Sequence, residues 1–146
     1  THADMQSDPE DILRAFELYR QADSENIIVK GGRKNRRLSE ALFTFGMQLV
    51  TFLILKVYLK DINAQPKLFS REFFDKYLKD NAPDDFSLDL YTLYQAQKYN
   101  YTILTIPVYF APRLHGEAKG GGGSWKNRIM LIKRTFKYII CLRKNL

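Results

Sequence analysis

The sequence predicts an α/β domain in which a mixed sheet is flanked by helices. Short apolar and β-branched runs alternate with longer segments of helical periodicity, in the order strand, helix, strand, helix, helix, strand. The chain of 146 residues is long enough for one domain with its own core, and its composition, 45% hydrophobic and 27% charged, is typical of a folded protein. Because the chain opens directly on a candidate site without an initiator Met, we expect the first strands of the sheet to lie upstream.

The first predicted helix covers residues 8–22, and a polar turn precedes it. Ser7 and Glu10 have the spacing of a capping box, with Pro9 in the first helical turn. The turn before them contains His2, Asp4 and Gln6. Oxygen donors at such a turn can bind a hard divalent cation, and the cation can bind phosphates. An ordinary capped surface helix explains the same residues without any ligand.

A β-branched run at residues 27–29 predicts a buried strand, and the glycines that follow predict a turn at residues 31–32. A basic loop comes next, at residues 33–37. Ser39 and Glu40 then begin an apolar stretch to about Leu59, which we interpret as a helix. Residues 41–55 carry no charge, but Lys56 ends this run before it reaches the length of a membrane-spanning helix. A helix in the core or in the membrane interface fits better.

The second half of the chain alternates in the same way. Residues 61–69 predict a loop and a short strand, after which Ser70 caps a short helix to Leu78. A polar break at residues 81–85 precedes a helix that begins at Ser87 and ends near residue 99. Residues 101–110 predict a strand, and Pro107 indicates that it is an edge strand or bent. A glycine-rich loop at 111–124 leads to a last helix at 125–142.

The net charge of +7 comes from the C-terminal end of the chain. Residues 119–146 contain eight basic residues and no acidic one, which leaves 15 basic and 16 acidic residues in the remainder. Such a segment indicates an anionic partner, and the last helix has the apolar face and basic flank of a helix on anionic lipid. Packing on the domain would also explain its apolar face. No base-stacking or base-reading module is evident, so we expect no nucleic acid. The single Cys141 excludes an internal disulfide.

Two motifs resemble glycosyltransferases of family 2, which have the GT-A fold. That family carries Asp-Ala-Asp-x-Gln before a Pro-Glu helix start, and here His2 replaces the first Asp. The segment from Arg113 to Lys119 resembles the Arg-x-x-Gly-x-Ser-Lys loop of polyprenyl- and dolichyl-phosphate sugar synthases, with Ala118 in place of the Ser. The chain therefore looks like the C-terminal half of a GT-A domain, and this half begins at the metal motif.

The resemblance implies roles for ten residues. The metal ligands for Mn²⁺ or Mg²⁺ would be His2, Asp4 and Gln6, and the phosphate-binding residues would be Arg33, Arg113 and Lys119. The acceptor side would contain Asp61, although Gln65-Pro66 stands where the family commonly has Gly. The amides of Asn63 and Gln65 on that side could hydrogen-bond sugar hydroxyls, and a plain turn before a strand explains them equally well. The catalytic carboxylate would be Asp89. From the residues alone, a helix-start acid such as Asp89 is equally explained by the helix dipole.

The resemblance also implies an organisation and a reaction. Residues 1–118 would form the metal and acceptor side of the catalytic domain, and residues 119–146 a glycine-rich loop with a basic amphipathic helix. The expected activity is inverting transfer of a sugar from a nucleotide-diphospho-sugar to a lipid-linked or glycan acceptor. We expect the protein to be cytoplasmic and peripheral on the anionic inner face of the membrane. The alternative is a non-enzymatic module that binds anions or the membrane surface.

Overall fold

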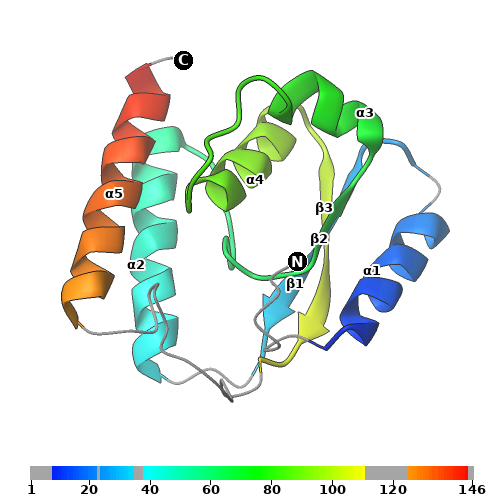
Figure 1. Cartoon of the computed structure of the whole chain (residues 1–146), viewed down its shortest axis with the longest axis horizontal. Coiled ribbons are helices and arrows are strands. Elements are labelled where there is room, and N and C mark those ends of the chain that lie inside the picture. Colours follow the sequence, from blue (N-terminus) through cyan, green and yellow to red (C-terminus); the bar gives the residue numbers. More distant parts are fainter. Residues whose placement is uncertain (1–7, 23, 35–37, 111–124, 145–146) are drawn as a thin grey trace.

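The computed structural model describes residues 8–22, 24–34, 38–110 and 125–144 (Figure 1). Its elements are α1 (Glu10–Gln21), β1 (Ile27–Arg33), α2 (Leu38–Leu55), β2 (Lys67–Phe69), α3 (Arg71–Phe73), a turn of π-helix η1 (Phe74–Leu78), α4 (Leu88–Lys98), β3 (Thr102–Val108) and α5 (Trp125–Lys144). Within these residues the fold is mixed α/β, with a small three-stranded sheet flanked by helices, as the sequence predicts at that level.

The sheet has the order β2-β1-β3, with β1 in the centre. β1 pairs antiparallel with β2 and parallel with β3, so the sheet is mixed. The side chains from Ile27 to Lys30 of this central strand are buried, because helices pack on both faces of the sheet. β3 is an edge strand of this sheet, which confirms the prediction from Pro107.

Helices cover both faces of the sheet. α1 packs on one face, where Ala15 meets Ile27 and Val29. The other face is covered by α4 and by the α3–η1 segment, where Ile28 meets Phe73. Successive strand residues point to opposite faces, which is why Ile28 and Val29 join different clusters. Figure 1 shows α2 and α5 side by side on the far side of α4 from the sheet.

α4 is buried on two sides because it lies between the sheet and the α2–α5 pair. Tyr91 belongs to the cluster on the sheet, whereas Leu93 and Tyr94 belong to a second cluster that contains Leu55 of α2 and Ile139 of α5. A helix buried on several sides shows little amphipathic pattern. The first turn of α4 is thereby held close to the sheet, and this position brings Asp89 to the site described below.

Two predicted boundaries differ from the structure, and one predicted helix cap is confirmed. The predicted turn at Gly31 and Gly32 is wrong, because β1 continues through both glycines to Arg33 along its parallel partner. Gly31 is needed for close approach: a Cβ there would lie 2.1 Å from the carbonyl oxygen of Gln65. The predicted helix to Leu59 ends at Leu55, where Lys56 takes a left-handed backbone with φ 59°. The Ser70 cap is confirmed, since its hydroxyl accepts a hydrogen bond from the Phe73 backbone at 3.0 Å.

Within the part of the chain that the structure describes, neither α2 nor another helix combines the length and hydropathy of a membrane span.

Candidate functional site

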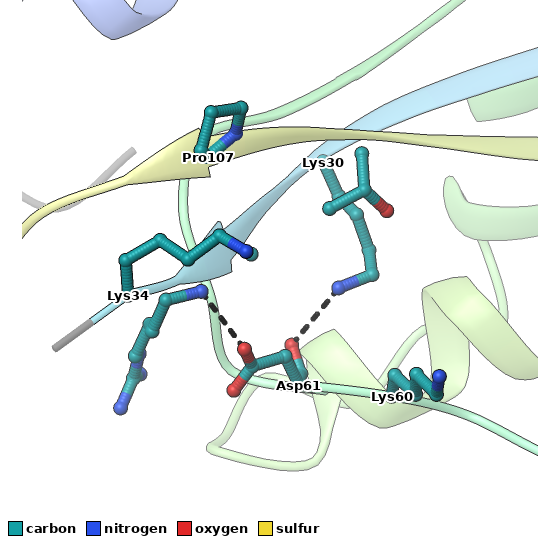
Figure 2. Close-up of a pocket in the computed structure, with 8 residues that line it drawn as sticks. Lys30, Lys34, Lys60, Asp61 and Pro107 are labelled. Carbon is teal, nitrogen blue, oxygen red and sulfur yellow. Dashed lines mark hydrogen bonds between the residues drawn. The ribbon is translucent and has the colours of Figure 1, made fainter. Parts of the chain in front are cut away.

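The candidate site is an open pocket of about 460 Å³ at the carboxyl ends of β1 and β3 (Figure 2). Its charged lining residues are Lys30, Arg33, Lys34, Lys60 and Asp61. Thr105 and Pro107 of β3 form an adjoining wall. In open sheets with parallel strands, ligands bind outside the carboxyl ends of those strands. With four basic residues and one acidic residue in its lining, the pocket is electrostatically suited to an anion.

Asp61 links the loop after α2 to the end of β1. Its carboxylate accepts a hydrogen bond from the backbone N–H of Arg33 at 2.8 Å, and its carbonyl oxygen accepts one from the Lys30 ammonium at 3.3 Å. Figure 2 shows both contacts, with the Lys30 ammonium directed at the backbone carbonyl of Asp61. The backbone of Asp61 is left-handed, with φ 48°, a conformation that Asp adopts more readily than most residues. The loop is therefore fixed at the pocket by both its side chain and its backbone.

Arg33 is held at the rim of the pocket by two further contacts. Its guanidinium donates a hydrogen bond to the carbonyl oxygen of Asn63 at 2.7 Å. The same group stacks over the Phe110 ring, 4.7 Å from the ring centroid. An arginine oriented in this way presents a planar set of donors that matches the oxygens of a phosphate. Asn63 contributes its backbone here, whereas its side chain is exposed.

Lys30 is a buried lysine whose ammonium is bound by backbone carbonyls. Only 3% of the residue is exposed, and its ammonium donates to the carbonyl oxygens of Gly31 at 3.0 Å and Asp61 at 3.3 Å. Burial lowers the pKa of Lys30 to about 8, and the charge of Asp61 opposes part of that effect. The amino group is therefore mostly protonated at neutral pH, but at a free-energy cost that a bound anion would reduce.

A second cluster lies beside the first and contains Gln65, Lys67 and Asp89. The Lys67 ammonium donates to the Asp89 carboxylate at 2.7 Å, and the Gln65 amide donates to its two oxygens at 3.1 and 3.3 Å. Lys67 also donates to the Ala64 carbonyl at 3.1 Å. Burial lowers the pKa of Lys67, while its pairing with Asp89 acts in the opposite direction.

The two clusters are neighbours because Lys30 and Lys67 stand directly opposite each other in the β1–β2 pair. Residues opposite each other in antiparallel strands project from the same face of the sheet, here the face covered by α4. Two buried lysines next to each other repel, and the charge of Lys67 is one of the causes that lower the pKa of Lys30. The pocket and the Asp89 cluster therefore form one electrostatic unit.

Five of the residues that the sequence predicts for the site are described, and the structure brings them together. Arg33, Asp61 and Asn63 meet at the pocket, and Gln65 and Asp89 meet in the adjoining cluster. The predicted metal ligands His2, Asp4 and Gln6 lie outside the described residues, as do the predicted phosphate-binding residues Arg113 and Lys119. The described residues hold no group of three or more His, Cys, Asp or Glu side chains placed to share a metal ion.

Four lysines of the site were not predicted from the sequence: Lys30, Lys34, Lys60 and Lys67. A signal for Lys30 was present, because it continues the buried run Ile27-Ile28-Val29 at a position where the chain stays inside the sheet. Lysine is rarely buried unless it has a partner or a function.

No protein-family model matches the sequence, and no solved structure matches the chain at a significant level. We therefore infer function from the residues of the site.

Proposed function

We propose that the chain supplies the phosphate-binding and acceptor side of a glycosyltransferase with a GT-A fold, which uses a nucleotide-diphospho-sugar as donor. One observation carries this proposal. Residues implied for donor phosphates and for the acceptor are separated by up to 56 positions in the sequence yet form two adjoining clusters. Arg33 and Asp61 meet at the carboxyl ends of the parallel strands β1 and β3, and Gln65 and Asp89 meet beside them. A shared location is what a two-substrate transfer requires, because both reactants must meet at one atom.

The charge of the pocket supports a phosphate-bearing donor. Four basic residues face a single carboxylate, and Arg33 has the fixed orientation that favours two-pronged contact with phosphate oxygens. When the sugar leaves its carrier, negative charge builds up on the departing diphosphate. Cations already in position stabilise that charge without having to reorganise. Lys30 and Arg33 would supply this stabilisation.

The Asp89 cluster supports a role on the acceptor side. In the proposed step, an acceptor hydroxyl oxygen forms a bond to the anomeric carbon as the bond from that carbon to the diphosphate oxygen breaks. The hydroxyl proton passes to the Asp89 carboxylate, whose position is fixed by Lys67 and Gln65. A phosphate acceptor is already ionised and needs no proton transfer. Attack from the face opposite the leaving group inverts the configuration.

The resemblance implies Mn²⁺ or Mg²⁺ on the donor diphosphate, held by His2, Asp4 and Gln6. When bound, such an ion would add positive charge at the leaving group. The roles given above to Lys30, Arg33 and Asp89 do not depend on its geometry.

The test measures thermal stabilisation of the full-length protein by UDP-, GDP-, dTDP- and CDP-sugars, each with and without Mn²⁺. We expect one nucleotide class to stabilise the protein, and Arg33→Gln to weaken its binding about tenfold through loss of a charge-assisted contact. The matched control is Arg71→Gln, which removes an exposed arginine that pairs with Asp75 away from the pocket. Stabilisation by none of the four classes would overturn the proposal.

The variant Asp89→Asn distinguishes the glycosyltransferase proposal from the alternative of a non-enzymatic anion-binding module. The amide keeps the size of the side chain and an acceptor oxygen for Lys67, but it cannot take up a proton. For a transferase with a hydroxyl acceptor, we expect donor binding to persist while sugar transfer falls by at least a hundredfold. Nucleotide binding without transfer in the wild-type protein would favour the module.

A further inference from the structure

α2 carries a row of large apolar side chains that face solvent. Phe45, Leu49, Phe52 and Leu53 are between 46% and 58% exposed. Their spacing places them on one face of the helix, while Leu55 on another face is buried in the core. Single exposed apolar residues are common on protein surfaces, but a continuous row of four is typical of a surface that binds something.

α5 lies next to α2 and carries both exposed apolar and exposed basic side chains. It packs beside α2, with Ile139 in the same core cluster as Leu55, and Figure 1 shows the two helices side by side. Its exposed apolar residues include Ile129, Phe136 and Ile140. Its exposed basic residues include Lys133, Lys137, Arg143 and Lys144, and residues 125–144 contain no acidic residue. Arg134 is excluded from this set because it pairs with Asp85 at 2.7 Å.

We propose that the exposed residues of α2 and α5 form a docking surface for anionic lipid, here called the α2–α5 face. In this arrangement both helices lie in the plane of the membrane interface. The α2 side chains enter the boundary between headgroups and acyl chains, and the α5 ammonium groups contact lipid phosphates. α2 thus supplies most of the apolar contact and α5 supplies the charge. The sequence of α5 by itself predicts an amphipathic helix with an apolar face and a basic flank. The contribution of α2 becomes visible only in the structure, which places α2 beside α5.

The positive charge and the apolar row together favour anionic lipid over a second copy of the chain and over nucleic acid as the binding partner. A second copy of the chain would bring the same uncompensated positive charge against α5, and like charges across an interface oppose association. A nucleic acid would satisfy the charge but leave the apolar row of α2 in water. Anionic lipid provides both a negative surface and an apolar layer beneath it. The proposal does not depend on the glycosyltransferase activity, since lipid binding needs neither a donor nor the pocket.

The first test uses the wild-type chain and two kinds of vesicle, one of phosphatidylcholine alone and one with about a third phosphatidylglycerol. Co-sedimentation at low salt should show binding to the anionic vesicles that is at least tenfold stronger than to the neutral ones. High salt should weaken that binding, because it screens exposed charges. Equal binding to both vesicles, or binding to neither, would overturn the proposal.

Two pairs of variants then locate the surface. Leu49→Gln/Phe52→Gln should reduce binding to anionic vesicles about tenfold or more, because the apolar contact is lost. Its control, Leu13→Gln/Phe16→Gln, removes two similarly exposed apolar residues from α1 and should bind as the wild type does. Lys133→Gln/Lys137→Gln should reduce binding about tenfold or more at low salt. Its control, Lys79→Gln/Lys98→Gln, makes the same change in net charge on other elements.

The controls make the result decisive. If both lysine pairs reduce binding equally, the effect is one of net charge and the α2–α5 face is not the docking surface. If Leu49→Gln/Phe52→Gln binds vesicles normally but abolishes self-association seen by sedimentation without lipid, the face is an interface between copies. All four substituted positions on this face are exposed, and far-UV circular dichroism verifies that each variant remains folded.

Discussion

Replacing Lys30 by Met tests whether the buried positive charge of Lys30 destabilises the fold. Lys30 is buried in the central strand, and its pKa falls from 10.5 to about 8 because burial disfavours the ammonium. Each pKa unit is worth about 1.4 kcal/mol, so the charged side chain destabilises the fold by about 3 kcal/mol at pH 7. Met has a similar length and no charge. It leaves the carbonyl oxygens of Gly31 and Asp61 without one donor, which costs about 1–2 kcal/mol.

The expected effect on stability therefore changes with pH. A lysine whose pKa is lower in the folded state binds fewer protons there than in the unfolded chain, so its cost is fully present below pH 8. That cost is lost as the pH rises from about 8 toward 10.5. At pH 7, Lys30→Met should raise the free energy of unfolding by about 1–2 kcal/mol. Between pH 7 and pH 10 the wild type should regain about 2.5 kcal/mol relative to the variant, which reverses the order of stability.

The assay is urea denaturation followed by circular dichroism, with the wild type and the variant at each pH unit from 7 to 10. Subtracting the two curves removes contributions from groups that titrate in both proteins. Lys34→Met serves as the control for loss of one positive charge, because Lys34 is an exposed lysine at the rim of the same pocket. Parallel pH profiles for wild type and Lys30→Met would refute the reasoning, since a buried charge with a lowered pKa must produce a pH-dependent difference.

Three further predictions concern stability and are checked by the same denaturation curves. Gly31→Ala should destabilise by about 3 kcal/mol or more, because its Cβ would lie 2.1 Å from a backbone oxygen, whereas Gly46→Ala, with open space at its Cβ, should stabilise α2 by about 0.5–1 kcal/mol. Equal effects at the two glycines would contradict the close approach. Asp89→Ala should cost about 2 kcal/mol by leaving the buried Lys67 unpaired, and adding Lys67→Met should recover part of the loss; purely additive effects would show that the pair is uncoupled. Ser70→Ala should cost about 1 kcal/mol, and no change would argue against the cap.

Local signals predicted most elements of the fold but not how the chain passes through its glycines. The Ser70 cap and the edge position of the strand with Pro107 follow from the hydrogen-bonding chemistry of single residues, and both are confirmed. Gly31 was misread because two glycines in a row usually indicate a turn. In the structure the same absence of a side chain lets the loop that contains Gln65 approach a continuing strand. Sequence alone does not distinguish these two uses of glycine.

The site could be predicted in part for a similar reason. Asp61, Asn63 and Gln65 lie in one short segment, so any fold keeps them near one another. The contact of Gln65 with Asp89 depends instead on how α4 packs between two layers, and no spacing rule predicts that packing. Lys30 and Lys67 lie opposite each other only because of the register of their two strands, and in the sequence those strands are separated by a long helix.

The distribution of unfavourable features among the described residues supports the proposed location of the site. Most of the described core consists of apolar side chains that pack on both faces of β1. Beside the pocket, which has more basic than acidic residues, two lysine side chains are buried opposite each other, and this breaks the usual rule that charged groups stay exposed. Natural proteins retain such conflicts mainly at functional sites, because each of them lowers the stability of the free protein. An anion in the pocket would pair with Lys30 and Arg33 and raise the pKa of the buried amine. Binding of such an anion would therefore reduce the free-energy cost of the buried charge and stabilise the protein.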